Sequence, residues 1–194
     1  MDVHPKTLEG RHVRLVPLAP EHHQALCQVG LDAGLWEWTT TQVRTPESMR
    51  DYIEEALRYQ QAGTCLPFTV IHRADQRVIG STRYGNIDRA NRRLEIGWTW
   101  YGRPWQRTAV NTECKYLLLR HAFESLGAIR VELKTDSLNQ RSRAAILRIG
   151  AREEGTLRNH MITWSGRLRH TVYYSVIETE WPDVKRRLEE MLSR

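Results

Sequence analysis

Residues 94–113 read LEIGWTWYGRPWQRTAVNTE, and this stretch decides the fold. Its first part is rich in aromatic and β-branched side chains and predicts a strand, and a short polar loop then leads into a helical pattern. Such a junction places the unpaired N–H groups of the first helical turn beside the end of the strand. Those groups and the helix dipole favour an anion, so the stretch predicts a phosphate-binding junction, reinforced by Arg103 and Arg107.

Strand and helix patterns continue on both sides of this junction. Polar and apolar residues alternate at 11–18 and 129–135, which predicts strands there, and the local pattern predicts further strands at 68–71, 78–87, 93–100, 151–158 and 171–177. Apolar residues at helical spacing predict helices at 21–31, from 46 onward, at 111–126, at 139–149 and over about 180–194. The chain is therefore expected to form one mixed α/β domain over 1–194, with a mostly antiparallel sheet of about seven strands flanked by helices.

The composition is typical of an ordinary globular protein. Hydrophobic residues make up 40% and charged residues 27% of the chain, so a buried core can form. No apolar stretch is long enough to predict a membrane span, and the polar N-terminus does not have the pattern of a secretory signal, so we expect a cytoplasmic protein. The three separated cysteines and the scattered histidines lack metal-ligand spacing, so no metal site is expected.

The formal net charge of +6 indicates that anionic partners are attracted to the surface. The basic residues are spread along the chain among acidic ones, and no nucleic-acid-binding motif accompanies them. A polyphosphate cofactor would use the same positive field. A basic nucleic-acid-binding module therefore stays open as the less favoured alternative.

Four short motifs carry a family resemblance, namely EIGW at 95–98, TE at 112–113, NQRS at 139–142 and IGA at 149–151. With them the chain resembles the GNAT superfamily, and within it the ribosomal-protein-alanine N-acetyltransferases of the RimJ/RimL type. The resemblance implies a GNAT-like fold and direct transfer of an acetyl group from acetyl-CoA to a primary amine, on a protein N-terminus or a small molecule. Family members are often homodimers, which makes the C-terminal segment a candidate contact surface.

The resemblance also implies where acetyl-CoA binds. The family's pyrophosphate-binding pattern and the residue after it align with Gln106, Arg107, Thr108, Ala109, Val110, Asn111 and Thr112. Ala109 and Asn111 stand where the family has smaller residues that let phosphate oxygens approach the backbone, so a catalytically weak, CoA-binding regulatory protein is a further alternative. The residues implied to meet the pantetheine arm are Trp98, Thr99, Trp100 and Asn139.

Two residues are candidates for proton transfer. Direct transfer needs a neutral amine, and Glu95 is the candidate base because strand alternation would place it on one face with Gly97 and Thr99. A surface carboxylate paired with a nearby arginine is the alternative. Through the resemblance, Ser142 is the candidate general acid for the CoA thiolate, and a purely structural serine is the alternative.

Trp36 and Trp38 lie in a polar segment after the first helix. Exposed aromatic side chains supply binding area, so both are candidates for the acceptor site, with packing in the core as the alternative. The identity of the acceptor amine does not follow from the sequence, because the loops that form such a site vary independently of the fold.

Overall fold

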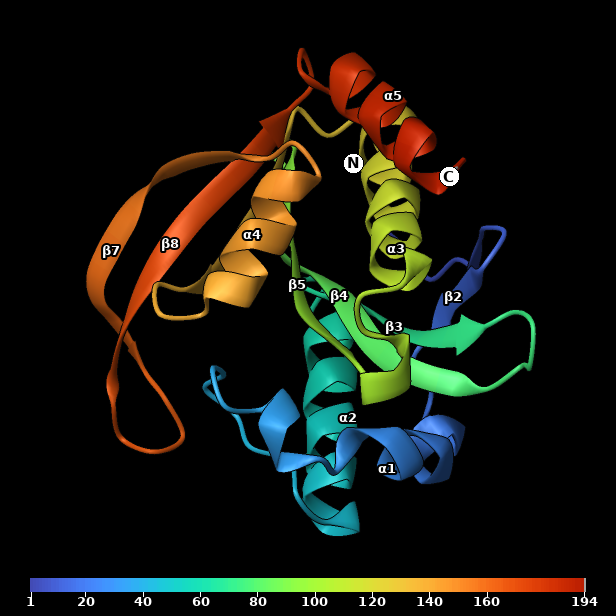
Figure 1. The fold of residues 1–194 in the computed structure, drawn as a ribbon, viewed down its shortest axis with the longest axis vertical. Coiled ribbons are helices and arrows are strands. Elements are labelled where there is room, and N and C mark those ends of the chain that lie inside the picture. Colours follow the sequence, from blue (N-terminus) through green and yellow to red (C-terminus); the bar gives the residue numbers. More distant parts are fainter. Residues whose placement is uncertain (194) are drawn as a thin grey trace.

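An eight-stranded sheet runs through the protein in the computed structural model, which describes residues 1–193 (Figure 1). The strands are β1 (Leu8–Glu9), β2 (Val13–Pro17), β3 (Leu66–His72), β4 (Val78–Asp88), β5 (Arg93–Tyr101), β6 (Arg130–Asp136), β7 (Arg152–Ile162) and β8 (Leu168–Ile177). The helices are α1 (His23–Gly30), α2 (Pro46–Gln61), α3 (Ala109–Arg120), α4 (Gln140–Arg148) and α5 (Trp181–Leu192). The strand order is β1-β2-β3-β4-β5-β6-β8-β7, and β5 and β6 form the parallel pair in an otherwise antiparallel sheet.

The predicted mixed α/β fold is confirmed, with eight strands instead of about seven. The additional strand is β1, whose two residues are too few to show an alternating pattern. The helix predicted at 111–126 begins earlier, at Ala109, and ends in a π-helical turn at His121–Ser125. The predicted C-terminal helix is α5, and Arg194 lies outside the described residues.

The two faces of the sheet carry different helices, as two neighbouring residues of β4 show. Tyr84 donates a hydrogen bond to the backbone carbonyl of Leu118 in α3 at 2.5 Å, whereas Arg83 donates to the carbonyl of Tyr52 in α2 at 3.2 Å. Consecutive strand residues point to opposite faces. The sheet therefore has an α3 face, and an opposite face, called the α2 face, that packs against α1 and α2.

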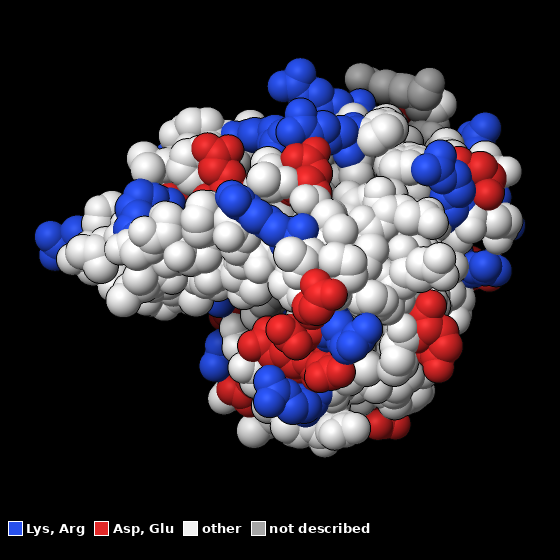
Figure 2. All heavy atoms as spheres, turned by 90° about the horizontal axis from the view of Figure 1, so that it is seen from below, with Lys and Arg blue, Asp and Glu red and all other residues white. Residues whose placement is uncertain are grey.

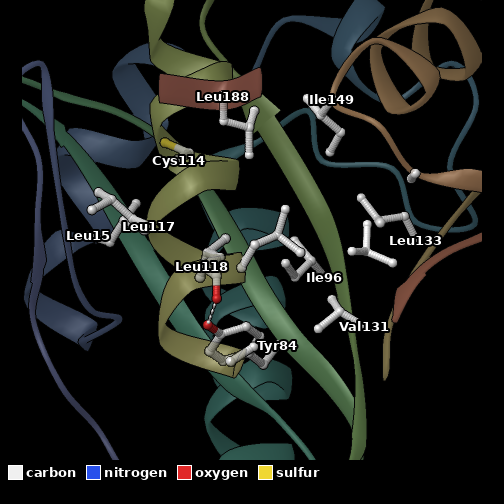
Figure 3. Close-up of a cluster of buried hydrophobic side chains, with 14 of the residues drawn as sticks. Leu15, Tyr84, Ile96, Cys114, Leu117, Leu118, Val131, Leu133, Ile149 and Leu188 are labelled. Atoms are coloured by element: carbon white, nitrogen blue, oxygen red, sulfur yellow. Dashed lines mark hydrogen bonds between the residues drawn. The ribbon is translucent and has the colours of Figure 1, made fainter. Parts of the chain in front are cut away.

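Each face has its own hydrophobic core. The core of the α3 face also contains residues of α4 and α5, and Figure 3 shows part of it, including Tyr84, Ile96, Leu118, Leu133 and Leu188. The core of the α2 face is smaller and is built around Leu26, Trp36, Met49, Ile53 and Trp100. Two packed layers on one sheet fix the ends of β5 and α3, where the predicted phosphate-binding junction lies.

Charged side chains are mixed on the surface. Figure 2, seen from the end of the molecule where α1 and α2 lie, shows acidic and basic groups side by side, with no continuous basic surface on this face. The positive net charge is therefore spread among acidic groups on this side, which is unlike the clustered basic surface of a nucleic-acid-binding module.

Candidate active site

The strands β5 and β6 diverge in the middle of the sheet. Their parallel pairing covers only the pairs from Arg93–Arg130 to Glu95–Glu132. Beyond this point β5 continues along β4 to Tyr101, and β6 continues along β8. Within the described residues, the facing edges of the two strands then have no pairing with each other, so backbone N–H and C=O groups there are available to an extended ligand.

A β-bulge in β5 accompanies this divergence. Between the pairs Arg83–Gly97 and Ser81–Trp100, β4 contributes one residue and β5 contributes two. Trp98, one of these two, has a φ of 49°, in the left-handed region that is uncommon for residues other than glycine. A bulge of this kind bends the strand and redirects its side chains, and such bulges are frequent beside active sites.

Because of the bulge, the side chains of β5 do not follow the strict alternation between faces that the sequence predicted. Gly97 pairs with Arg83, and the side chain of Glu95 lies against Gly97, so both residues belong to the α2 face. Thr99 instead accepts a hydrogen bond from the Lys115 ammonium of α3 at 2.9 Å. The prediction that Glu95, Gly97 and Thr99 share one face is therefore wrong for Thr99, because the extra residue shifts the alternation by one position.

Glu95 is buried at the point of divergence, with 2% of its surface exposed. Its Oε2 accepts a hydrogen bond from Asn86 Nδ2 at 2.7 Å and forms an ion pair with Lys134 Nζ at 2.9 Å. A Cβ atom on Gly97 would lie 2.7 Å from Oε1, so the glycine leaves room for the carboxylate. The alternative of a surface carboxylate paired with an arginine is excluded.

The predicted phosphate-binding junction forms the N-terminus of α3. Arg107 has a φ of 60°, and Thr108 caps the helix by accepting a hydrogen bond from the N–H of Val110 at 3.3 Å. This abrupt turn lets the helix begin immediately at Ala109, and the first-turn N–H groups of an α-helix have no partners within the helix. The segment 106–112 is therefore built as an anion-binding helix N-terminus.

Two arginines of α4 add positive charge to this helix N-terminus, and sequence reasoning missed both. Arg141 Nη1 donates to Gln106 Oε1 at 3.1 Å, and Arg148 Nη2 donates to Thr112 Oγ1 at 3.0 Å. The two arginines lie seven positions apart on one helix, which places them on the same face. That spacing was a signal in the sequence. Arg103, which was expected here, instead forms an ion pair with Asp32.

The structure shows a capping role for Asn139. Its Oδ1 accepts a hydrogen bond from the N–H of Ser142 at 3.0 Å and so caps α4. Ser142 is half-buried in the first turn of this helix. A structural role of Asn139 is thus present, and contacts of either residue with a ligand remain predictions.

The tryptophans predicted near the site separate into two groups. Trp36 is 2% exposed, donates from Nε1 to the carbonyl of Gly30 at 2.8 Å and packs against Trp100, so its side chain belongs to the α2-face core. The expectation of an exposed Trp36 is corrected, because α2 and β5 supply apolar partners that its polar neighbours in sequence conceal. Trp38 is half-buried, and Trp98 is 41% exposed.

A buried lysine on the opposite face is a further residue that sequence reasoning missed. Lys115 is 7% exposed, and its hydrogen bond to Thr99 continues to Thr82 through a 2.8 Å contact between hydroxyl oxygens. Burial lowers the pKa of Lys115 from 10.5 to about 8. Lys115 is followed at helical spacing by Leu118, Leu119 and Ala122, and its alignment with these apolar residues was the signal for it.

Replacement of Lys115 by methionine is expected to change the pH dependence of stability. Unfolded Lys115 keeps its proton up to about pH 10.5, whereas the folded protein releases it near pH 8, so unfolding takes up a proton in this window and raising the pH stabilises the folded protein. Relative to K115M, the wild type should gain about 3 kcal/mol of unfolding free energy between pH 7 and 10.5. Denaturant unfolding of both proteins measures the difference, and parallel curves would contradict the prediction.

Comparison with known proteins identifies the family. Residues 12–152, which are most of the chain, match the protein family described as "Acetyltransferase (GNAT) domain". The chain belongs to the GNAT acetyltransferase family. This confirms the predicted family and gives the chain the fold of an acetyl-CoA-dependent N-acetyltransferase.

Individual relatives of this GNAT chain agree with that assignment. It is 33% identical to the Bacillus subtilis protein named "Putative ribosomal N-acetyltransferase YdaF" over 57% of this chain, and the match spans 60% of that protein. A GCN5-related N-acetyltransferase from Brucella melitensis has 32% identity and a TM-score of 0.90, over 98% of this chain and 86% of that one. Mycobacterium smegmatis RimJ, solved with CoA-disulfide, shares the fold at 23% identity with a TM-score of 0.82, over 96% and 95% of the chains. The names agree with the RimJ/RimL-like branch.

Two features are absent from the part of the chain that the structure describes. Among residues 1–193, no helix has both the length and the apolar character needed to span a bilayer. In the same part of the chain, no group of three His, Cys, Asp or Glu side chains is arranged so that it could hold a metal ion.

Proposed function

We propose that the GNAT chain transfers an acetyl group directly from acetyl-CoA to a primary amine, with a protein N-terminus as the leading acceptor. The observation that carries the proposal is the divergence of β5 and β6 beside the N-terminus of α3. It combines two free strand edges with an anion-binding helix end. An extended ligand that carries phosphates at one end fits both features.

The residues at this junction fit acetyl-CoA as a substrate. The N–H groups of the first turn of α3 would bind the pyrophosphate, with Arg107, Arg141 and Arg148 supplying positive charge. The backbone of β5 around Trp98 and Thr99 would pair with the pantetheine arm. The thioester supplies the activated acetyl group, and it would then lie at the point of divergence.

Glu95 is the proposed base for the acceptor amine. Its carboxylate lies on the α2 face at the point of divergence, where it can take a proton from the amine directly or through one water molecule. Asn86 and Lys134 hold the carboxylate in place, so its position is fixed before an acceptor binds. Ser142, in the first turn of α4, remains the proposed proton donor to the CoA thiolate.

The experiment that tests this function is a calorimetric titration with acetyl-CoA, followed by thiol release on a panel of amines. The wild type should bind acetyl-CoA with a micromolar dissociation constant and release CoA only when an acceptor is present. Binding without turnover on any amine would favour a catalytically weak CoA-binding protein. Absence of binding would refute the proposal.

Loss of both α4 arginines is expected to weaken acetyl-CoA binding. The double variant R141Q/R148Q removes two charge-assisted contacts to phosphate, so its dissociation constant should rise at least about tenfold, more at low salt than at high salt. Arg186→Gln is a matched control, because Arg186 lies on α5 and its ion pair is with Asp183 of the same helix. Equal affinities of all three proteins would place the phosphates elsewhere.

A further inference from the structure

A cluster of cations and aromatic rings lies beside Glu95 on the α2 face. We call it the cation–aromatic cluster, and its members are Trp38, Trp98, Lys134, Arg167, Arg169 and Tyr173. The Lys134 ammonium lies 5.9 Å from the ring centre of Trp98 and 5.8 Å from that of Tyr173. The Arg167 guanidinium lies 5.7 Å from the ring centre of Trp38. These contacts bring the strands β5, β6 and β8 together with the loop after α1.

The β7–β8 hairpin and the loop after α1 enclose this cluster. Figure 1 shows the hairpin reaching toward that loop from the far edge of the sheet. Trp164 at the hairpin turn donates from Nε1 to the carbonyl of Trp36 at 2.8 Å, and Arg169 Nη1 donates to the carbonyl of Trp38 at 3.5 Å. Segments far apart in sequence thus form two sides of one site, whose inner end is Glu95.

The charges in the cluster do not balance. Lys134 is paired with Glu95, and Arg167 is paired with the buried carboxylate of Asp136. Arg169 is only 8% exposed, yet within residues 1–193 no carboxylate lies within ion-pair distance of it. Its partners are neutral, namely Thr171 Oγ1 at 3.1 Å and the Trp38 carbonyl. One buried cation therefore lacks a carboxylate in direct contact.

A second buried cation lies under the ring of Trp98. Arg83 is 1% exposed and stacks on Tyr52, with its guanidinium carbon 4.2 Å from that ring centre and 5.8 Å from the ring centre of Trp98. Its side-chain hydrogen bond is to the Tyr52 carbonyl, and among the described residues Nε of Arg83 has no partner. Arg83 therefore adds a second positive charge beside the cluster, and its guanidinium contacts Tyr52 and Trp98 instead of a carboxylate.

A buried cation that no carboxylate contacts is costly, because desolvation penalises the charged form and more distant carboxylates repay only part of that cost. Burial lowers the pKa of Arg169 despite the opposing effect of the Asp136 and Glu95 carboxylates, and the pKa of His160 on β7 is lowered by burial and by the charges of Lys134 and Arg169. The positive field therefore extends across the site. An anionic group entering it would gain charge-assisted hydrogen bonds.

We propose that the cation–aromatic cluster binds a carboxylate of the acceptor, with Arg169 as its principal contact and the amine directed toward Glu95. The acceptor is then a primary amine that carries a carboxylate close by, as in a peptide N-terminus followed by Glu or Asp, or in a free amino acid. The Arg169 contact with the Trp38 carbonyl is at the long limit of a hydrogen bond, so a carboxylate can replace it at little cost. This inference rests on the proposed function, because it names the acceptor of the same site.

The test compares acceptors of closely similar shape in which carboxylates are replaced by amides. The peptide arm uses two amidated tetrapeptides that begin with Ala-Glu or Ala-Gln, and the small-molecule arm uses free glutamate and glutamate diamide. Initial rates of thiol release give kcat/KM, and quenching of tryptophan fluorescence in the presence of CoA gives the dissociation constant without turnover. We expect the wild type to favour the carboxylate-bearing acceptor of at least one arm by about tenfold or more in both readouts.

Arg169→Gln should reduce this preference to about twofold or less while leaving the dissociation constant for acetyl-CoA unchanged, which also shows that the variant is folded. Arg169→Lys keeps the charge and should retain part of the preference. Arg158→Gln, which alters an exposed arginine of β7, is the matched control and should retain all of it.

Three outcomes are informative beyond the expected one. Equal use and equal binding of acidic and amide acceptors by the wild type would overturn the inference, as would a full preference in R169Q. Preferential binding of the acidic acceptors without acetyl transfer would contradict the proposed function and support the carboxylate site. The arm with the stronger preference distinguishes a peptide from a free amino acid.

Discussion

Replacement of Glu95 by glutamine is expected to lower kcat about 10²- to 10⁴-fold, the range for loss of a general base. The side chain keeps its shape, and Asn86 and Lys134 still surround it, so the change removes the proton acceptor with little disturbance of the site. The KM for acetyl-CoA should change less than about threefold, because the proposed phosphate site lies at α3 and not at Glu95. Steady-state rates with saturating acetyl-CoA and a fixed amine measure both quantities.

A control for this variant is Glu153→Gln on β7. Glu153 forms an ion pair with Arg143 at 3.3 Å and is largely solvent-exposed, so its replacement tests the loss of a carboxylate away from the point of divergence. We expect its kcat to stay within about twofold of the wild type. If Glu95→Gln also retained the wild-type kcat, the base would have to be another group, and the proposed role of Glu95 would be wrong.

The sequence predicted the order of the elements because most of them have strong periodicity. Strand-like sequence patterns identified all strands except β1, whose two residues are too few to form such a pattern. The strand β7 extends beyond its predicted end at Arg158 to Ile162, because its residues are almost all exposed and carry little apolar pattern. Local patterns identify elements that bury one face, and they are weaker where an element is stabilised by pairing alone.

Side-chain directions at the site were harder to predict, because they depend on contacts between distant segments. The bulge at Trp98 is defined by pairing with β4, and a one-residue shift moves Thr99 to the other face. The polar neighbours of Trp36 suggested exposure, whereas α2 and β5 bury it. That no carboxylate directly contacts Arg169 likewise becomes visible only when β6, β8 and the loop after α1 are brought together.

Glu113 is a buried carboxylate whose loss should strongly destabilise the fold. It projects from α3, is 4% exposed, and its carboxylate accepts hydrogen bonds from the backbone N–H groups of Arg11, His12 and Val13 at 2.8, 2.6 and 2.7 Å. A Cβ atom on Gly10 would lie 2.4 Å from Glu113 Cδ, so the chain passes closely around the carboxylate. One side chain of α3 thereby fixes the start of β2, a hundred residues earlier in the chain.

Replacement of Glu113 by alanine is expected to cost about 3 kcal/mol of unfolding free energy, because it leaves three donors at a largely buried position without an acceptor. For a chain of this size, this corresponds to a decrease of about 6 to 12 °C in Tm. Glu113→Gln should also be destabilised, since its amide group presents a donor to the same backbone donors. Glu190→Ala on the exposed face of α5 is the control and should change the free energy by about 0.5 kcal/mol or less. Denaturant unfolding measures all three variants, and a loss in Glu113→Ala no larger than in the control would mean that water replaces the carboxylate and that α3 does not hold β2 through this contact.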